Sequence, residues 1–334
     1  MEKRNKFRQL LQEQKPTIST RLHSTWPLVT EAVGVLGIYD YIEFVGEYAP
    51  YDQYDMENMV RAAELHNMGS MMKVDYQNRE FAAQKAVASG FQAILFADHT
   101  KPEEVEDTIK MILPKCPAYG GKMGYAARRW IGYQSFSAME DYADTSAETV
   151  KAFMIEKKEA VDRIDEICSV PGIDMIQFGP NDFALSSGIN VKDNRDQIKA
   201  AEKKVIETAI SHGIRPRCEL NSAEEGEYYL SLGVKDFSLG LEIRILQNFL
   251  SKEGDKLLNI MAKNGLIRQI LFIREKKMRL TFDEIQTEIK RVFVKYGMSE
   301  EKAEICARIH TESTYDGIYS HGTGRVARFV DYIK

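Results

Sequence analysis

The sequence predicts an α/β protein: a closed (β/α)8 barrel (TIM barrel) followed by a small all-helical appendage at the C-terminal end. Three observations lead to this prediction. Short apolar runs alternate with helix-like stretches, eight such runs occur, and no strand-like run alternates with the helices after residue 265. Eight strands, each followed by a helix, favour a closed barrel over an open sheet.

The strand candidates share a short length and a high content of apolar and β-branched residues. They are TISTRLH (17–23), YIEFV (41–45), SMMKV (70–74), AILFA (93–97), KAFMIE (151–156), DMIQFG (174–179), RPRCEL (215–220) and DFSLG (236–240).

The segments between these runs have the periodicity of amphipathic helices, and several end in a glycine at the C-cap position. They include PLVTEAVGVLG, MENMVRAAELHNMG, FAAQKAVASG, PEEVEDTIKMIL, EAVDRIDEICSV and QIKAAEKKVIETAISHG. The segment EIRILQNFLSKEGDKLLNIMAKN would then be the last barrel helix.

One connection is much longer than the others. Residues 115–146 are rich in glycine, tyrosine and arginine. A long insertion in a compact domain is usually a functional loop or lid, and the alternative is a contact between copies of the chain. The sequence leaves both interpretations open.

The last part of the chain has a different pattern. We expect a barrel domain at residues 1–265, a linker at 266–277 and a helical fragment at 278–334. The fragment contains two amphipathic stretches, with a capping signal at Thr281–Glu284 and another at Ser299.

Composition excludes several classes of partner. The net charge is −5 with acids and bases interspersed, so we expect no nucleic-acid binding. We find no apolar stretch long enough for a membrane span and no signal-peptide pattern. We therefore expect a cytoplasmic protein that does not bind a membrane. The four cysteines are scattered, which argues against a disulfide scaffold or a thiolate zinc site.

Carboxylates gather where the predicted strands end, which is where barrel enzymes carry their chemistry. The residues at these ends are Glu47, Tyr48, Lys73, Asp98, His99, Glu156, Asp182 and Glu219. Such a rim suits Mg²⁺ or Mn²⁺. Glu156 ends a mainly apolar strand, where a carboxylate is costly unless it is paired or metal-bound. For Asp182, a helix cap and a metal ligand are both open.

Three segments carry a family resemblance: YDYIEFVGEYAPYD, MIEKKEAVDRIDEICSVPGIDMIQFGPNDFALSSG and YLSLGVKDFSLGLE. They resemble the HpcH/HpaI aldolase and citrate lyase family over about residues 6–264. The resemblance implies a homo-oligomer, a hexamer or trimer of dimers. It also implies cleavage of a 4-hydroxy-2-oxo acid or 2-keto-3-deoxy sugar acid into pyruvate, or a related 2-oxo acid, and an aldehyde.

The resemblance also assigns site residues. Glu156 and Asp182 fall on the two metal-binding carboxylates, with Mg²⁺ or Mn²⁺ as cofactor. The backbone at Gly179, Pro180 and Asn181 would help to seat the substrate carboxylate.

Three departures from the family pattern concern the catalytic groups. Tyr48 stands where the family has a histidine after Gly-Glu, Lys73 stands where it has an arginine, and Met154 stands where it has a glutamine. The catalytic candidates are therefore Glu47, Tyr48 and Lys73, with His99 as either a replacement base or an ordinary turn residue. A catalytically impaired protein that binds a keto acid or serves assembly is the alternative.

Residues 278–334 resemble the start of the malate/L-lactate dehydrogenase family, which includes diketogulonate reductase. The motif SHG places that family's catalytic histidine at His321. The nicotinamide-binding body has no counterpart in this sequence, and a histidine cannot transfer hydride without a cofactor. We therefore expect an inactive fragment and no NAD. An aldolase and reductase in one chain would require nucleotide binding.

Overall fold

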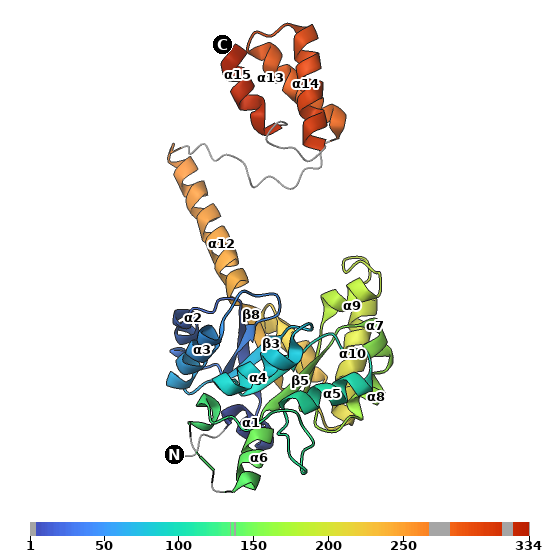
Figure 1. Cartoon of the computed structure of the whole chain (residues 1–334). Helices are drawn as coiled ribbons and strands as arrows, with labels where there is room; N and C mark the ends of the chain where they lie inside the picture. The colour runs from blue at the N-terminus through green and yellow to red at the C-terminus, as the bar shows by residue number, and fades with distance from the viewer. Residues whose placement is uncertain (1–4, 134, 137, 267–280, 316–322, 334) are drawn as a thin grey trace. The chain divides into compact units, whose positions relative to one another are not determined.

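The computed structural model describes residues 5–133, 135–136, 138–266, 281–315 and 323–333. Eight parallel strands close into a barrel in sequence order, with helices around it (Figure 1). The strands are β1 (Thr17–Leu22), β2 (Tyr41–Val45), β3 (Gly69–Val74), β4 (Ala93–Phe96), β5 (Val150–Ile155), β6 (Met175–Phe178), β7 (Arg215–Leu220) and β8 (Asp236–Leu241). Each strand end lies within one residue of its predicted position, and the barrel is confirmed.

The helices follow the predicted order with some differences. They are α1 (Lys6–Gln12), α2 (Pro27–Gly34), α3 (Gln53–Leu65), α4 (Arg79–Ser89), α5 (Pro102–Ile112), α6 (Met139–Ala147), α7 (Lys158–Asp162), α8 (Ile164–Cys168), α9 (Pro180–Ser186), α10 (Arg195–Ser211), α11 (Gly226–Ser231) and α12 (Glu242–Lys263). The stretch predicted as one helix at EAVDRIDEICSV is interrupted at Arg163, whose φ and ψ of −103° and 22° leave the helical region.

The barrel interior is apolar toward the amino ends of β2 to β6. Met71, Leu95 and Met175 pack there with Phe7 of α1, whose ring stacks on Tyr41 at a centroid distance of 4.2 Å. Helix α1 therefore closes this end of the barrel. At the amino ends of β1, β7 and β8 the buried Asp236 accepts from Thr17 and pairs with Arg215, and further polar interior residues occur nearer the carboxyl ends of the strands.

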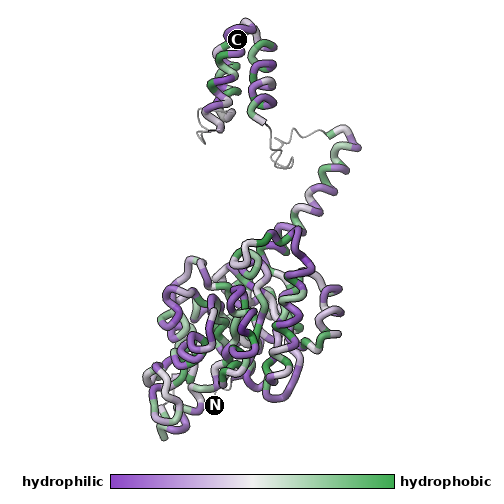
Figure 2. Tube along the Cα trace, turned by 90° about the vertical axis from the view of Figure 1, so that its right-hand side faces the viewer, coloured by the Kyte–Doolittle hydropathy of each residue, from purple (hydrophilic) through white to green (hydrophobic). Residues whose placement is uncertain are grey.

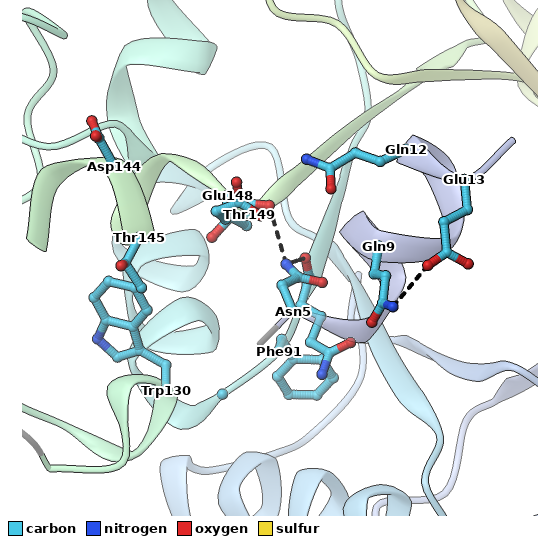
Figure 3. Close-up of a pocket in the computed structure, with 12 residues that line it drawn as sticks. Asn5, Gln9, Gln12, Glu13, Phe91, Trp130, Asp144, Thr145, Glu148 and Thr149 are labelled. Carbon is cyan, nitrogen blue, oxygen red and sulfur yellow. Dashed lines mark hydrogen bonds between the residues drawn. The ribbon is translucent and has the colours of Figure 1, made fainter. Parts of the chain in front are cut away.

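The long connection joins the end of α5 to the amino end of β5. It contains a 3-10 turn (Arg129–Ile131) and α6. Together with α1 it borders a hollow of about 520 Å³, lined by Asn5, Gln9, Trp130 and Asp144 among others (Figure 3). This hollow lies at the amino end of the strands, so Trp130 and α6 are at the end opposite the strand termini that carry the candidate site. Lys122 and Arg128 of the same connection pair with Glu80 of α4 and Glu57 of α3. The interpretation as a functional loop or lid stays a prediction. A contact between copies stays a prediction.

Helix α12 has no buried residue in the single chain. Hydrophobic and hydrophilic residues alternate along it (Figure 2), and the exposed apolar ones include Ile245, Leu246, Phe249 and Leu250. Exposed apolar surface of this kind is often covered by another protein surface. The predicted homo-oligomer stays a prediction.

Internal contacts divide the chain into two compact units, Met1–Leu257 and Leu258–Lys334. In the second unit, α13 (Phe282–Lys295), α14 (Glu300–Tyr315) and α15 (Val326–Ile333) pack around Phe293. The capping box predicted at Thr281–Glu284 is confirmed. Residues 267–277 of the predicted linker and His321 lie outside the described residues.

None of the described helices combines the length and the apolar content that a membrane span requires.

Candidate active site

The carboxyl ends of β2, β4 and β5 bring three carboxylates together. Glu47, Asp98 and Glu156 each place one oxygen within 4.8 Å of the oxygens of the other two. We call these three residues the acid cluster. Hard carboxylate oxygens are the donors that Mg²⁺ and Mn²⁺ prefer, so the residues present fit such an ion.

Lys73, at the end of β3, places a positive charge beside the acid cluster. It forms an ion pair with Glu47, and its Nζ lies 4.0 Å from an oxygen of Glu156. Burial lowers the pKa of Lys73, but the neighbouring charges of Glu156 and Glu47 outweigh this effect and raise it. The ammonium group therefore stays charged at neutral pH.

Glu156 is the most buried member of the acid cluster, at 2% exposure. The backbone N–H of Asp98 donates to its Oε1 at 3.1 Å. Burial raises the pKa of Glu156 to about 7, although the charge of Lys73 opposes this shift. Burying an ionised carboxylate costs free energy unless its charge is compensated, so a further cation bound beside Glu156 would stabilise its charged form.

Gly179 permits this position of Glu156. A Cβ atom added to Gly179 would lie 2.7 Å from the Cβ of Glu156 and 2.9 Å from its Oε2. These contacts are too short for any side chain, so residue 179 must be glycine for Glu156 to stand where it does. Pro180 and Asn181 follow at the start of α9, in the predicted position.

Asp182 lies at the edge of the acid cluster and is linked to it by Lys157. The Nζ of Lys157 is 2.5 Å from Asp98 and 3.9 Å from Asp182, whose side chain is 49% exposed. Four carboxylates and two lysines leave a formal charge of −2, which one divalent cation would balance. The sequence analysis missed Lys157, whose only signal was its position directly after Glu156.

The backbone is strained on two sides of the acid cluster. Tyr48 and Asp98 have φ angles of 61° and 62°, a left-handed conformation that non-glycine residues rarely adopt. The N–H of Tyr48 donates to Asp75 at 2.9 Å, and the side chain of Tyr48 is 78% exposed. The charge of Glu47, followed by burial, raises the pKa of Tyr48. Its hydroxyl group therefore keeps its proton at neutral pH.

His99 points away from the acid cluster. Its ring is fully buried beside Phe153, and its Nε2 lies 2.8 Å from the Oγ1 of Thr108 on α5. Burial, followed by the charge of Arg79, lowers the pKa of His99 to about 3. A neutral ring held between the barrel wall and a helix cannot act as the general base at the rim. The expectation that His99 replaces the base is corrected, and the turn-residue interpretation is retained.

His99 gives the first testable prediction. Because its pKa is lower in the folded state, the unfolded chain binds a proton between about pH 6.5 and pH 3 that the folded chain does not. Stability should therefore fall as the pH falls through this range, by about 2 kcal/mol at pH 5. In urea unfolding at pH 7 and pH 5, wild type should lose about this much more than His99→Gln. Equal losses in the two proteins would contradict the assignment.

A buried ionic network forms the floor beneath the rim. Arg217 of β7 pairs with Glu43 of β2 and donates to the hydroxyl group of Tyr41 at 2.7 Å and to Gln177 of β6. Arg217 and Glu43 are both almost completely buried. The sequence analysis missed this pair because the two residues are 174 positions apart in the chain. A charged residue inside an otherwise strand-like run was its only signal.

The two units of the chain match different proteins. Residues 280–334 match the malate/L-lactate dehydrogenase family model. Over 57 residues, the chain is 42% identical to the 2,3-diketo-L-gulonate reductase of Haemophilus influenzae, and this match covers 17% of each protein. The predicted resemblance of the C-terminal fragment is confirmed over this short stretch.

The barrel has relatives that are named aldolases. It is 24% identical over 214 residues to a hydroxypyruvate/pyruvate aldolase of Paraburkholderia phytofirmans, covering 63% of this chain and 81% of the relative. It is 26% identical over 210 residues to the 2-keto-3-deoxy-L-rhamnonate aldolase of Escherichia coli K12, covering 62% of this chain and 74% of the relative.

A solved structure shares the fold. An HpcH/HpaI aldolase/citrate lyase family protein from Burkholderia cenocepacia J2315 has a TM-score of 0.68 at 19% identity, covering 76% of this chain and 99% of that one. The family model described as HpcH/HpaI aldolase/citrate lyase matches residues 23–241, which include the whole acid cluster. The chain therefore belongs to the HpcH/HpaI aldolase/citrate lyase family.

Proposed function

We propose that the barrel is a metal-dependent carbon–carbon lyase, a class II aldolase. Its substrate would be a 4-hydroxy-2-oxo acid or 2-keto-3-deoxy sugar acid, cleaved to pyruvate or a related 2-oxo acid and an aldehyde. The observation that carries the proposal is the acid cluster with Lys73 beside it, at the carboxyl ends of the barrel strands. The family and the names of its aldolase relatives support it.

Glu156 and Asp182 are the proposed metal ligands, and Glu47 and Asp98 lie close enough to hold the ion directly or through water. Bound there, Mg²⁺ or Mn²⁺ would act as a Lewis acid toward the 2-oxo acid. The first turn of α9, at Gly179, Pro180 and Asn181, is the proposed seat of the substrate carboxylate.

The residues of the chain divide the remaining tasks. Lys73, held charged by its carboxylate neighbours, stabilises the negative charge that develops on the carbonyl oxygen as the C3–C4 bond breaks. Tyr48 donates a hydrogen bond from the mouth of the barrel. Because Tyr48 stays protonated and His99 points away, we assign Glu47 as the acceptor of the proton from the 4-hydroxyl group.

The second candidate is a catalytically impaired family member that binds a keto acid or serves assembly. Tyr48, Lys73 and Met154 favour it, because each differs from the group that the family resemblance implies at its position. Lysine keeps the positive charge but lacks the planar guanidinium fork, so it holds a carboxylate or carbonyl less rigidly.

One experiment separates the two candidates. The full chain is incubated with pyruvate in D₂O with Mg²⁺, and exchange of the methyl protons is followed by NMR, alongside aldol addition to a panel of aldehydes. An aldolase should catalyse both reactions and lose both in EDTA, with recovery on adding Mg²⁺ or Mn²⁺. Pyruvate binding in calorimetry without exchange or addition would support the impaired protein and refute the aldolase.

A further inference from the structure

A second charged pair lies at the carboxyl ends of the strands, outside the acid cluster. Arg21, near the end of β1, forms an ion pair with Glu219, near the end of β7. The two side chains are 16% and 28% exposed, so both are partly open to solvent at the rim. Neither residue has a role in the proposed chemistry.

The local backbone directs Arg21 to this position. The pairing of β1 with β8 shifts in register between Ser19 and Arg21, as at a bulge or a similar irregularity. Bulges next to active sites re-aim side chains. The Nε of Arg21 donates to the carbonyl oxygen of Gly240 at 3.2 Å, which fixes the plane of the guanidinium group.

Strand register places Glu219 at the level of Glu156, two strands further along the rim. Ile155 of β5 pairs with Phe178 of β6, so the next residues along, Glu156 and Gly179, stand side by side. In the same way, the pairing of β6 with β7 at Gln177 and Arg217 brings Gly179 level with Glu219 two residues further on. Gly179 has no side chain, so β6 places nothing between the two glutamates at this level.

The pair is supported from below. The Nε2 of Gln177 donates to Glu219 at 2.6 Å, and the Oε1 of Gln177 accepts from the buried Arg217. Glu219 is therefore fixed as an acceptor by two donors, Arg21 and Gln177. We call Arg21, Glu219 and Gln177 the polar wall, because ion pairing and hydrogen bonds hold these side chains in place.

Charge balance indicates what this wall would bind. Arg21 and Glu219 neutralise each other, as do Arg217 and Glu43 beneath them. A site without net charge gives no preference to a carboxylate or phosphate terminus. A hydroxyl group, by contrast, can accept from a guanidinium group and donate to a carboxylate at the same time.

We propose that the Arg21–Glu219 pair binds hydroxyl groups on the aldehyde half of the substrate, and so selects polyhydroxylated substrates. This inference rests on the proposed function, since it assigns the second half of the same site. The acid cluster and Lys73 would hold the 2-oxo acid half, and the Arg21–Glu219 pair would hold the chain of hydroxylated carbons beyond C4.

The test is aldol addition of pyruvate with Mn²⁺ to two aldehydes of equal length, glyceraldehyde and propanal. Wild type should favour glyceraldehyde in kcat/KM by at least about tenfold. Glu219→Gln and Arg21→Met should each lower kcat/KM for glyceraldehyde by about tenfold or more and leave the value for propanal unchanged. Arg21→Lys should recover part of the loss. The surface pair Arg163–Glu166 provides matched controls, Arg163→Met and Glu166→Gln.

The outcomes are separable. Equal losses for both aldehydes would overturn the inference, because a purely structural role does not distinguish them. A wild-type preference for succinic semialdehyde over glyceraldehyde would overturn it in favour of an anion site. Exchange of the pyruvate methyl protons reports the proposed function separately: retained exchange with no aldehyde preference refutes only this inference. Absence of exchange and addition in wild type refutes both.

Discussion

Glu156→Gln is expected to lower kcat/KM for aldol cleavage or addition by about 10³-fold. Glutamine keeps the size of the side chain but removes the charge that attracts a divalent cation. Lys73 lies beside two carboxylates, Glu47 and Glu156, and the change removes the negative charge of the second. Mn²⁺ affinity, measured by calorimetry or by electron paramagnetic resonance, should fall together with activity.

Glu166→Gln is the matched control for this change. Glu166 lies on α8, where it pairs with Arg163 and has no contact with the acid cluster. This variant should keep the wild-type rate and Mn²⁺ affinity. His321→Ala should likewise leave lyase activity unchanged, because the fragment that carries it matches a different family. A Glu156→Gln protein with wild-type activity and Mn²⁺ affinity would refute the metal assignment.

The rim position of Glu156 could be predicted from the sequence, as could those of Glu47, Lys73 and Asp98, whereas the contacts among them could not. A carboxylate that ends a buried apolar strand must lie at the barrel rim and needs a compensating cation. The contacts made by Lys157 and Asp98 depend on the direction of side chains across neighbouring strands. That direction is fixed only when the barrel closes.

Asp98 and His99 illustrate the same limit at one turn. Both come directly after Ala97, which follows β4, and the sequence does not tell which of them faces the site. The left-handed conformation of Asp98 interrupts the alternation of an extended strand. As a result Asp98 joins the acid cluster, while His99 turns to Thr108 on the outside of the barrel wall.

Arg217→Met is expected to lower the free energy of unfolding by about 3–5 kcal/mol. The change leaves the carboxylate of Glu43 buried without its cation, and an isolated buried charge is far more costly than a paired one. Both tryptophans, Trp26 and Trp130, lie in the barrel unit. Their fluorescence in urea therefore reports unfolding of the barrel.

The double variant Arg217→Met/Glu43→Leu separates a charge effect from a packing effect. Removing both charges abolishes the buried ion pair without leaving an unpaired charge, so the part of the loss that comes from the isolated charge of Glu43 should return. The loss of the hydrogen bonds from Arg217 to Tyr41 and Gln177 stays in the double variant. A double variant that is destabilised by the sum of the two single changes would contradict this explanation, because the effects of independent sites add and those of coupled charges do not.

The double variant should also weaken the preference for glyceraldehyde over propanal, because Gln177 links Arg217 to Glu219. This effect is expected under conditions in which the barrel of the variant is fully folded. The floor network would then contribute to specificity as well as to stability.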